Sequence, residues 1–264
     1  MKPYIGITGF KTAQEVQAMN LAFERTEEIN YTAMYGFISS TKRMKKPEEQ
    51  GNESPALAEL EHILRCVPAN ALHALHYFTE EAQNVAREVT DITTRYDPES
   101  RLKAVQLNLT WPSPKQVELI RAHGLEVILQ LPRSATEGKT PSEIATKAKE
   151  YNGLANYILV DPSGGLGIEF EPKRAAEIMH AVASEIPAIV GAAGGLSAEN
   201  VFDRVITMRD LYENTPHTAT RLTNGFCIDA QGKLRNKKET VNEIDIEKAQ
   251  KYVCNAVNAF KASL

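Results

Sequence analysis

Short apolar runs alternate with helix-like stretches along the whole chain, and this alternation is the strongest constraint on the fold. The runs have the composition of strands buried on both faces, and caps or terminating glycines mark many of the stretches between them as helices. Eight strands are expected, at 2–8, 35–39, 71–78, 102–109, 126–131, 157–160, 188–192 and 226–229. Because the composition does not break between these units, the pattern predicts a single (β/α)8 TIM barrel over 1–264.

Two features qualify this prediction. An open doubly wound sheet is the alternative fold, but no Gly-x-Gly-x-x-Gly follows the first expected strand, so a dinucleotide-binding domain has little support. Between the second strand and the next helix, 41–55 is a polar stretch rich in Lys and Glu. It is expected to be a long loop inserted into the barrel, with either a functional or a merely solvated role.

Composition and charge exclude several classes of protein. The net charge is −4 over 264 residues, which gives no basic footprint for nucleic acid. No apolar run is long enough to span a bilayer and no signal-peptide pattern precedes the first strand, so a cytoplasmic globular protein is expected. Cys66, Cys227 and Cys254 are widely spaced, which argues against a metal site and a disulfide framework. The oligomeric state stays open.

Asp161 follows a buried apolar run and precedes Pro162 and a glycine-rich loop with Gly164, Gly165 and Gly167. In a parallel α/β protein, a polar residue at the carboxyl end of a strand lies at the face that carries the active site. Glycines allow turns of the backbone that other residues resist. Asp161 is therefore the first candidate for an acid at the barrel mouth, although it could simply open a turn.

Two glycine turns follow the last two expected strands. The seventh ends in Gly194 and Gly195 before Ser197, which is a good helix cap, and the eighth is followed by Ala230, Gln231 and Gly232. In such barrels these two loops often bind a phosphate through backbone N–H groups and the start of a helix. The pairing of the turns predicts a phosphate site here, and two ordinary turns are the alternative.

Several of these motifs resemble those of phosphoribosylanthranilate isomerases. Residues 194–201 resemble the signature of their seventh strand, and Asp161 with its glycine loop and Phe170 is similar to their sixth. Shorter similarities lie at 6–8, 36–38 and 105–108. The similarity is spread over most of the chain, but only the motifs of the sixth and seventh strands are specific.

The resemblance implies an activity of tryptophan biosynthesis, the Amadori isomerisation of a small phosphorylated amino-sugar, which needs no cofactor. By the same resemblance, Asp161 is the general acid, and its pKa has to be raised for that task. Arg43 is the best match for the residue that binds the anthranilate carboxylate. Other candidate substrate-binding residues are Gln106, Asn108, Gly164 and Gly165.

The chain departs from the family at the general base. A cysteine on the first strand has that role in the family, and Ile5 replaces it here, at a position expected to face Asp161. His76 and Cys227 are the candidate replacements, although a packed core histidine and a buried structural cysteine are the ordinary interpretations.

Asn108 and Ile168 replace a histidine and a lysine of the family. The offset of Asp229 from the following glycine leaves open which way its side chain faces. Three hypotheses remain: an isomerase of this type, a non-catalytic binder of a phosphorylated ligand, and a different reaction on the same scaffold.

Overall fold

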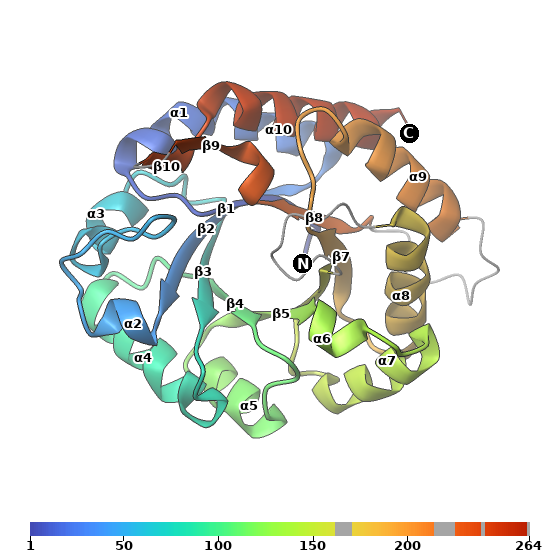
Figure 1. The fold of residues 1–264 in the computed structure, drawn as a ribbon, viewed down its shortest axis with the longest axis horizontal. Coiled ribbons are helices and arrows are strands. Elements are labelled where there is room, and N and C mark those ends of the chain that lie inside the picture. Colours follow the sequence, from blue (N-terminus) through green and yellow to red (C-terminus); the bar gives the residue numbers. More distant parts are fainter. Residues whose placement is uncertain (162–170, 214–224, 239–240, 263–264) are drawn as a thin grey trace.

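The computed structural model describes residues 1–161, 171–213, 225–238 and 241–262. Parallel strands close into a barrel in the order of the sequence, and the last of the eight pairs with the first (Figure 1). This confirms the predicted (β/α)8 barrel. The strands are β1 (Tyr4–Thr8), β2 (Thr32–Ser40), β3 (Leu72–Phe78), β4 (Ala104–Asn108), β5 (Glu126–Pro132), β6 (Tyr157–Asp161), β7 (Ile189–Ala193) and β8 (Cys227–Ala230).

Helices surround the barrel, and three of them begin with a side-chain cap, of which Thr140 was expected from the sequence. Thr12 and Thr140 each form a capping box with the glutamate three residues later, and Asp245 accepts a hydrogen bond from the backbone of Lys248. The last helix lies between the first and the ninth and completes the outer ring (Figure 1). The helices are α1 (Ala13–Glu24), α2 (Thr41–Met44), α3 (Leu60–Leu64), α4 (Val85–Tyr96), α5 (Pro114–Ala122), α6 (Arg133–Thr136), α7 (Pro141–Ala148), α8 (Pro172–Glu185), α9 (Val201–Glu213) and α10 (Ile246–Lys261).

Side chains alternate between the barrel interior and the helix layer along every strand. On β1, the Thr8 hydroxyl reaches Asp229 inside the barrel, and a Cβ placed on Gly6 would also point toward Asp229. Ile5 and Ile7 therefore face outward, and both belong to the large cluster that the barrel shares with its helices. A second, smaller apolar cluster fills the barrel interior: Tyr4, Met34, Leu72, Ala74, Ala104, Ile128, Tyr157, Leu159, Ala193 and Cys227.

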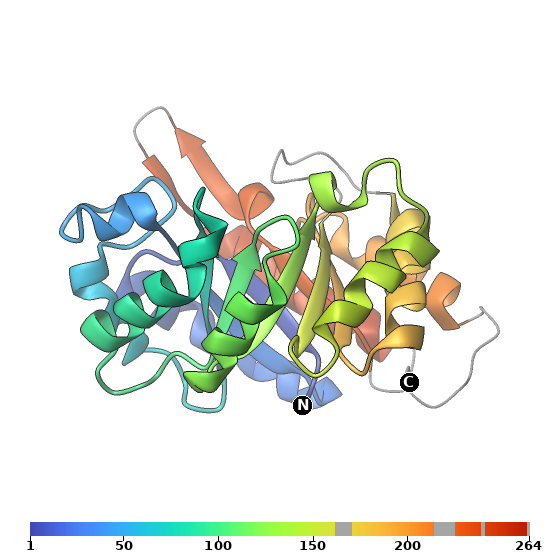
Figure 2. The same cartoon turned by 90° about the horizontal axis from the view of Figure 1, so that it is seen from below.

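An antiparallel hairpin follows β8 and was not expected from the sequence. Its strands are β9 (Arg235–Lys238) and β10 (Val241–Ile244). Figure 2 shows the hairpin and α2 on the side of the barrel away from the N-terminus. Arg235 is buried and donates to the carbonyl oxygens of Gly9 (3.0 Å) and Asn242 (2.5 Å). The hairpin is thus fixed to the loop that leaves β1.

The predicted insertion at 41–55 begins with the short helix α2 and reaches the hairpin through Glu53. The Glu53 carboxylate accepts hydrogen bonds from Asn242 (2.7 Å) and from Gln231 (2.5 Å). Its Oε1 lies 3.9 Å from Nε of Arg235. The insertion, the hairpin and the loop after β1 therefore form one connected rim beside the barrel mouth.

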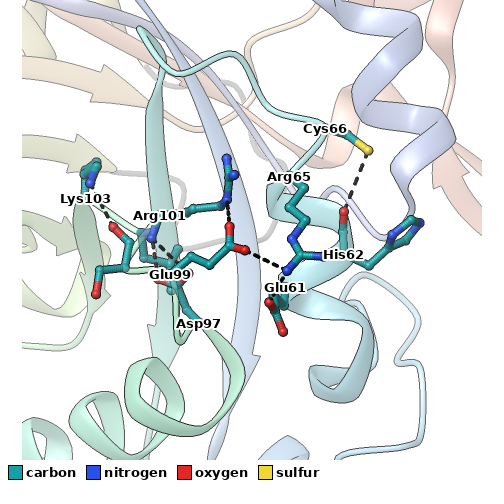
Figure 3. A network of polar contacts seen from close by, with 10 residues as sticks. Glu61, His62, Arg65, Cys66, Asp97, Glu99, Arg101 and Lys103 are labelled. Carbon is teal, nitrogen blue, oxygen red and sulfur yellow. Dashed lines mark hydrogen bonds and ion pairs between the residues drawn. The ribbon is translucent and has the colours of Figure 1, made fainter.

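A separate polar network lies on the outside of the barrel (Figure 3). Arg65, the residue that follows α3, forms ion pairs with Glu61 and Glu99, and Glu99 also pairs with Arg101. About half of the Arg65 side chain is exposed, so each pair contributes little to stability. The network fastens α3 to the connection between α4 and β4 and is distinct from the barrel interior.

Candidate active site

A layer of buried polar side chains lies in the barrel interior toward the carboxyl ends of the strands. Asp161 ends β6, Thr8 ends β1, and Asp229 is the third residue of β8. Gln106 is the third residue of β4, and Gln130 is the fifth residue of β5. All five are at least nine-tenths buried. In a barrel of this type, the carboxyl ends of the strands carry the catalytic groups.

Hydrogen bonds connect these five side chains across the barrel. Asp229 accepts from the Thr8 hydroxyl at 3.0 and 3.1 Å and from Nε2 of Gln106 at 3.1 Å. The same Gln106 nitrogen donates to Oε1 of Gln130 (3.0 Å), and Nε2 of Gln130 donates to Oδ2 of Asp161 (2.8 Å). The orientation of both amides follows from the carboxylates, because a reversed amide would turn its oxygen toward a carboxylate oxygen.

Burial raises the pKa of Asp229 to about 7 from its ordinary value of 3.8, and the charge of Asp161 adds to the increase. The hydrogen bonds from Gln106 and Thr8 act in the opposite direction because they favour the charged carboxylate. A carboxyl group that titrates near neutral pH is suited to take up and release protons during a reaction. The sequence did not identify this property of Asp229.

Asp229 owes its place to a glycine on the neighbouring strand. Gly6 pairs with it in register, and a Cβ at Gly6 would lie 3.2 Å from Oδ1 of Asp229 and 2.5 Å from the terminal carbon of Met34. A side chain at residue 6 would therefore crowd the carboxylate and would require the end of Met34 to move. The structure settles the open orientation of Asp229: it faces the barrel interior, beside Thr8.

Ile5 does not occupy the position expected from the family resemblance. The alternation on β1 directs Thr8 and Gly6 toward Asp229 and sends Ile5 to the opposite side of the strand, into the helix layer. The expectation that residue 5 faces Asp161 is therefore wrong. A side chain at position 5 cannot reach a ligand in the barrel mouth, whatever its chemistry.

The two candidate replacement bases lie at different depths. His76 pairs in register with Gln106, and burial lowers its pKa to about 4, so the ring is neutral at neutral pH. Its Nδ1 has no hydrogen-bond partner among the described residues. Cys227 is in the interior apolar cluster, two residues before Asp229, and its Sγ accepts from the backbone N–H of Tyr4 at 3.3 Å. Burial raises the pKa of this thiol above its ordinary value.

The expected substrate-binding residues are only partly brought together. Gln106 belongs to the polar layer, and Asn108 is the half-buried last residue of β4. Arg43 lies in α2 and donates to the carbonyl oxygen of Glu49 (3.1 Å) within the insertion. Gly164 and Gly165 lie outside the described residues.

The first predicted phosphate turn has the expected backbone. Gly194 and Gly195 have φ angles of 95° and 64°, which side chains disfavour. The Ser197 hydroxyl accepts from the backbone N–H groups of Glu199 and Asn200, and Asn200 in turn bonds Ser197 N and Gly195 O. The start of α9 is therefore well organised, but several of its N–H groups already have partners.

The second predicted phosphate turn, at Ala230, Gln231 and Gly232, carries an unexpected negative charge. The Gln231 side chain donates to the carboxylate of Glu53, which comes from the insertion. A carboxylate beside the turn disfavours an anion there. Of the two turns, the one at Gly194 and Gly195 is the more suitable for phosphate.

Neither a metal centre nor a membrane-spanning helix is present among the residues that the structure describes. No group of three or more His, Cys, Asp or Glu side chains in that part of the chain is arranged to hold a metal ion. No helix within the described ranges is long and apolar enough to cross a membrane.

Comparisons with known proteins find similarity in structure alone. No protein-family model matches the sequence, and no curated protein matches it. The phosphoribosyl anthranilate isomerase from Thermus thermophilus shares 16% identity over 97% of this chain and 98% of its own, with a TM-score of 0.62. The enzyme of that name from Thermotoga maritima shares 16% identity over 97% of this chain and 99% of its own, with a TM-score of 0.62.

The same architecture also resembles an enzyme of another kind. The carboxyl transferase domain of Rhizobium etli pyruvate carboxylase shares 11% identity over 98% of this chain and 48% of its own, with a TM-score of 0.55. At these identities the similarity establishes the fold. Because barrels of this shape support unrelated reactions, the function has to be argued from the polar layer.

Proposed function

We propose that this protein is a cofactor-free isomerase that interconverts the aldose and ketose forms of a small phosphorylated amino-sugar, as in the isomerisation of phosphoribosylanthranilate. The observation that carries the proposal is Asp161 at the carboxyl end of β6, oriented by Gln130 in a buried polar layer. The overall similarity to phosphoribosyl anthranilate isomerases supports it.

The reaction fits a site made of carboxylates and amides. An acid protonates the ring oxygen of the amino-sugar, the bond between that oxygen and C1 breaks, and the nitrogen lone pair forms a C1=N bond. A proton then leaves C2, and the electrons move so that C1 is reduced and C2 is oxidised. Because the redox change is internal, the reaction needs no cofactor. Asp161 is the proposed acid.

The substrate contacts follow from the loops around this layer. The backbone at Gly194 and Gly195, with the start of α9 behind it, is the proposed site of the phosphate. Asn108 and Gln106 lie on the same strand and are the proposed contacts to the sugar hydroxyls. Arg43 would have to leave the Glu49 carbonyl to bind a carboxylate, so the nature of the amine substituent is the least constrained part of the proposal.

The test is the loss of fluorescence when phosphoribosylanthranilate is converted by the purified protein. Asp161→Asn removes the acid but keeps the size of the side chain, so kcat should fall by ~10²–10⁴-fold while the affinity for the phosphorylated product changes little. Asp210→Asn, at a side chain that is 59% exposed, is the matched control and should be fully active. Absence of turnover in the wild type, or full activity in Asp161→Asn, would contradict the proposal.

A further inference from the structure

The isomerisation needs a group that removes the proton from C2, and the expected cysteine is absent. We infer that Asp229, on β8, is this general base and that Thr8 and Gln106 position its carboxylate. The inference rests on the proposed function, because it assigns a second catalytic residue to the same reaction.

The fold places Asp229 two strands away from Asp161, on β8 and β6 with β7 between them. Hydrogen bonds through Gln106 and Gln130 connect the two carboxylates, and all four side chains are buried. Asp229 accepts hydrogen bonds from the Thr8 hydroxyl, from Nε2 of Gln106 and from the backbone N–H of Ala230. The Thr8 hydroxyl has a single proton, so these three donors occupy three of the about four lone-pair positions of the carboxylate, and one remains to accept a proton from a ligand.

The other candidate bases are less suitable for structural reasons. Ile5 faces the helix layer, and Cys227 lies in the interior apolar cluster with a pKa raised by burial, so its thiolate is scarce. His76 lies on β3 beside Gln106 of the polar layer, but burial lowers its pKa to about 4, which makes it a weak base. A base with a pKa of about 7, as found for Asp229, is far stronger and still largely deprotonated at slightly alkaline pH.

The two carboxyl groups balance the protons of the reaction. Asp161 gives its proton to the ring oxygen, and the ring opens to the iminium form. The Asp229 carboxylate takes the C2 proton, the C2–H electrons form a C1=C2 bond, and the C1=N electrons return to nitrogen. The resulting enol loses its O2 proton to Asp161 while C1 takes the proton held by Asp229. The product is the ketose, and both carboxyl groups regain their starting states.

The amides have a defined role in this scheme. Gln106 and Gln130 donate to the carboxylates and contribute no titrating group, so the protons pass to and from the substrate. The Thr8 hydroxyl bonds both oxygens of Asp229 and fixes the plane of its carboxylate. Thr8 and Gln106 are therefore positioning residues, whereas Asp229 contacts the reacting atom.

The test compares Asp229→Asn and Asp229→Ala with the wild type on phosphoribosylanthranilate. In Asp229→Asn, kcat should fall by ~10²–10⁴-fold with KM within a few-fold, and the rise of kcat/KM through about pH 7 should disappear. In Asp229→Ala, added formate should restore activity in proportion to its concentration, because it can enter the space of the missing carboxylate. A merely structural aspartate would give neither the altered pH profile nor the rescue.

The outcomes separate this inference from the proposed function. An active wild type together with an Asp229→Asn variant of unchanged kcat and pH profile overturns the inference and leaves the isomerase proposal standing. Loss of activity without rescue by formate, and with an unchanged pH limb in the residual rate, also overturns it. A wild type that converts no phosphoribosylanthranilate overturns both. Asp229→Asn has nearly the same shape as the wild type, so it serves if the alanine variant fails to fold.

Discussion

Because of the polar layer, the free energy of unfolding should depend on pH, and this can be measured without any substrate. Folding raises the pKa of Asp229 from 3.8 to about 7, so the native state binds a proton that the unfolded chain releases more easily. The stabilising contribution of this proton is fully present below pH 3.8 and is lost as the pH rises through about 7. At alkaline pH, the wild type therefore keeps a buried charge at a cost in stability.

The size of this effect follows from the shift. One pKa unit corresponds to about 1.4 kcal/mol, and a shift of about three units corresponds to about 4 kcal/mol between the two limits of pH. Asp229→Asn removes the titration. The asparagine oxygen can accept from Gln106 and Thr8 in place of Oδ2, so the hydrogen bonds survive the exchange. Relative to the wild type, we expect the variant to gain about 4 kcal/mol between pH 4 and pH 8.

Urea unfolding at half-unit steps of pH measures this difference. The single tryptophan, Trp111, stacks on Tyr151 at 5.8 Å and reports the transition by fluorescence. All other titrating groups cancel in the difference between variant and wild type to a first approximation. Asp210→Asn gives the effect of the same exchange at an exposed site. A difference for Asp229→Asn that stays constant across the pH range would refute the assignment of a raised pKa to Asp229.

Two further predictions concern the rim and β1. Glu53→Gln should strengthen phosphate binding roughly fivefold, about 1 kcal/mol, because it removes a negative charge beside Gln231. Isothermal titration with inorganic phosphate measures this affinity, and an unchanged affinity would contradict the prediction. Ile5→Cys should leave kcat/KM on phosphoribosylanthranilate within twofold of the wild type, because residue 5 packs in the helix layer. For the same reason, the exchange should destabilise the protein by about 1–2 kcal/mol. A large gain in activity would show instead that residue 5 faces the barrel mouth.

The barrel fold could be predicted from the sequence because the patterns of its strands and helices are local and repeat along the chain. Strands buried on both faces have continuous apolar runs, and caps such as Thr140 mark the helices that separate them. The hairpin of β9 and β10 has no such signal. Its first strand reads Arg-Asn-Lys-Lys, and it is held by the buried Arg235 and by Glu53, which is far away in the sequence. Contacts between distant polar residues leave no periodic pattern to detect.

The site was harder to predict because it depends on which residues of each strand face the barrel interior. A continuous apolar run such as Tyr4–Thr8 hides which residues face inward, since both faces are buried. A shift of one residue exchanges the two sets, so matching Ile5 to the cysteine of a known motif assigned it to the wrong face. Only contacts with other strands show which residues face inward: the Thr8 hydroxyl donates to Asp229, and Gly6 leaves room for the Asp229 carboxylate. These partners place the carboxylate of the proposed base on β8, and residue 5 of β1 faces away from it.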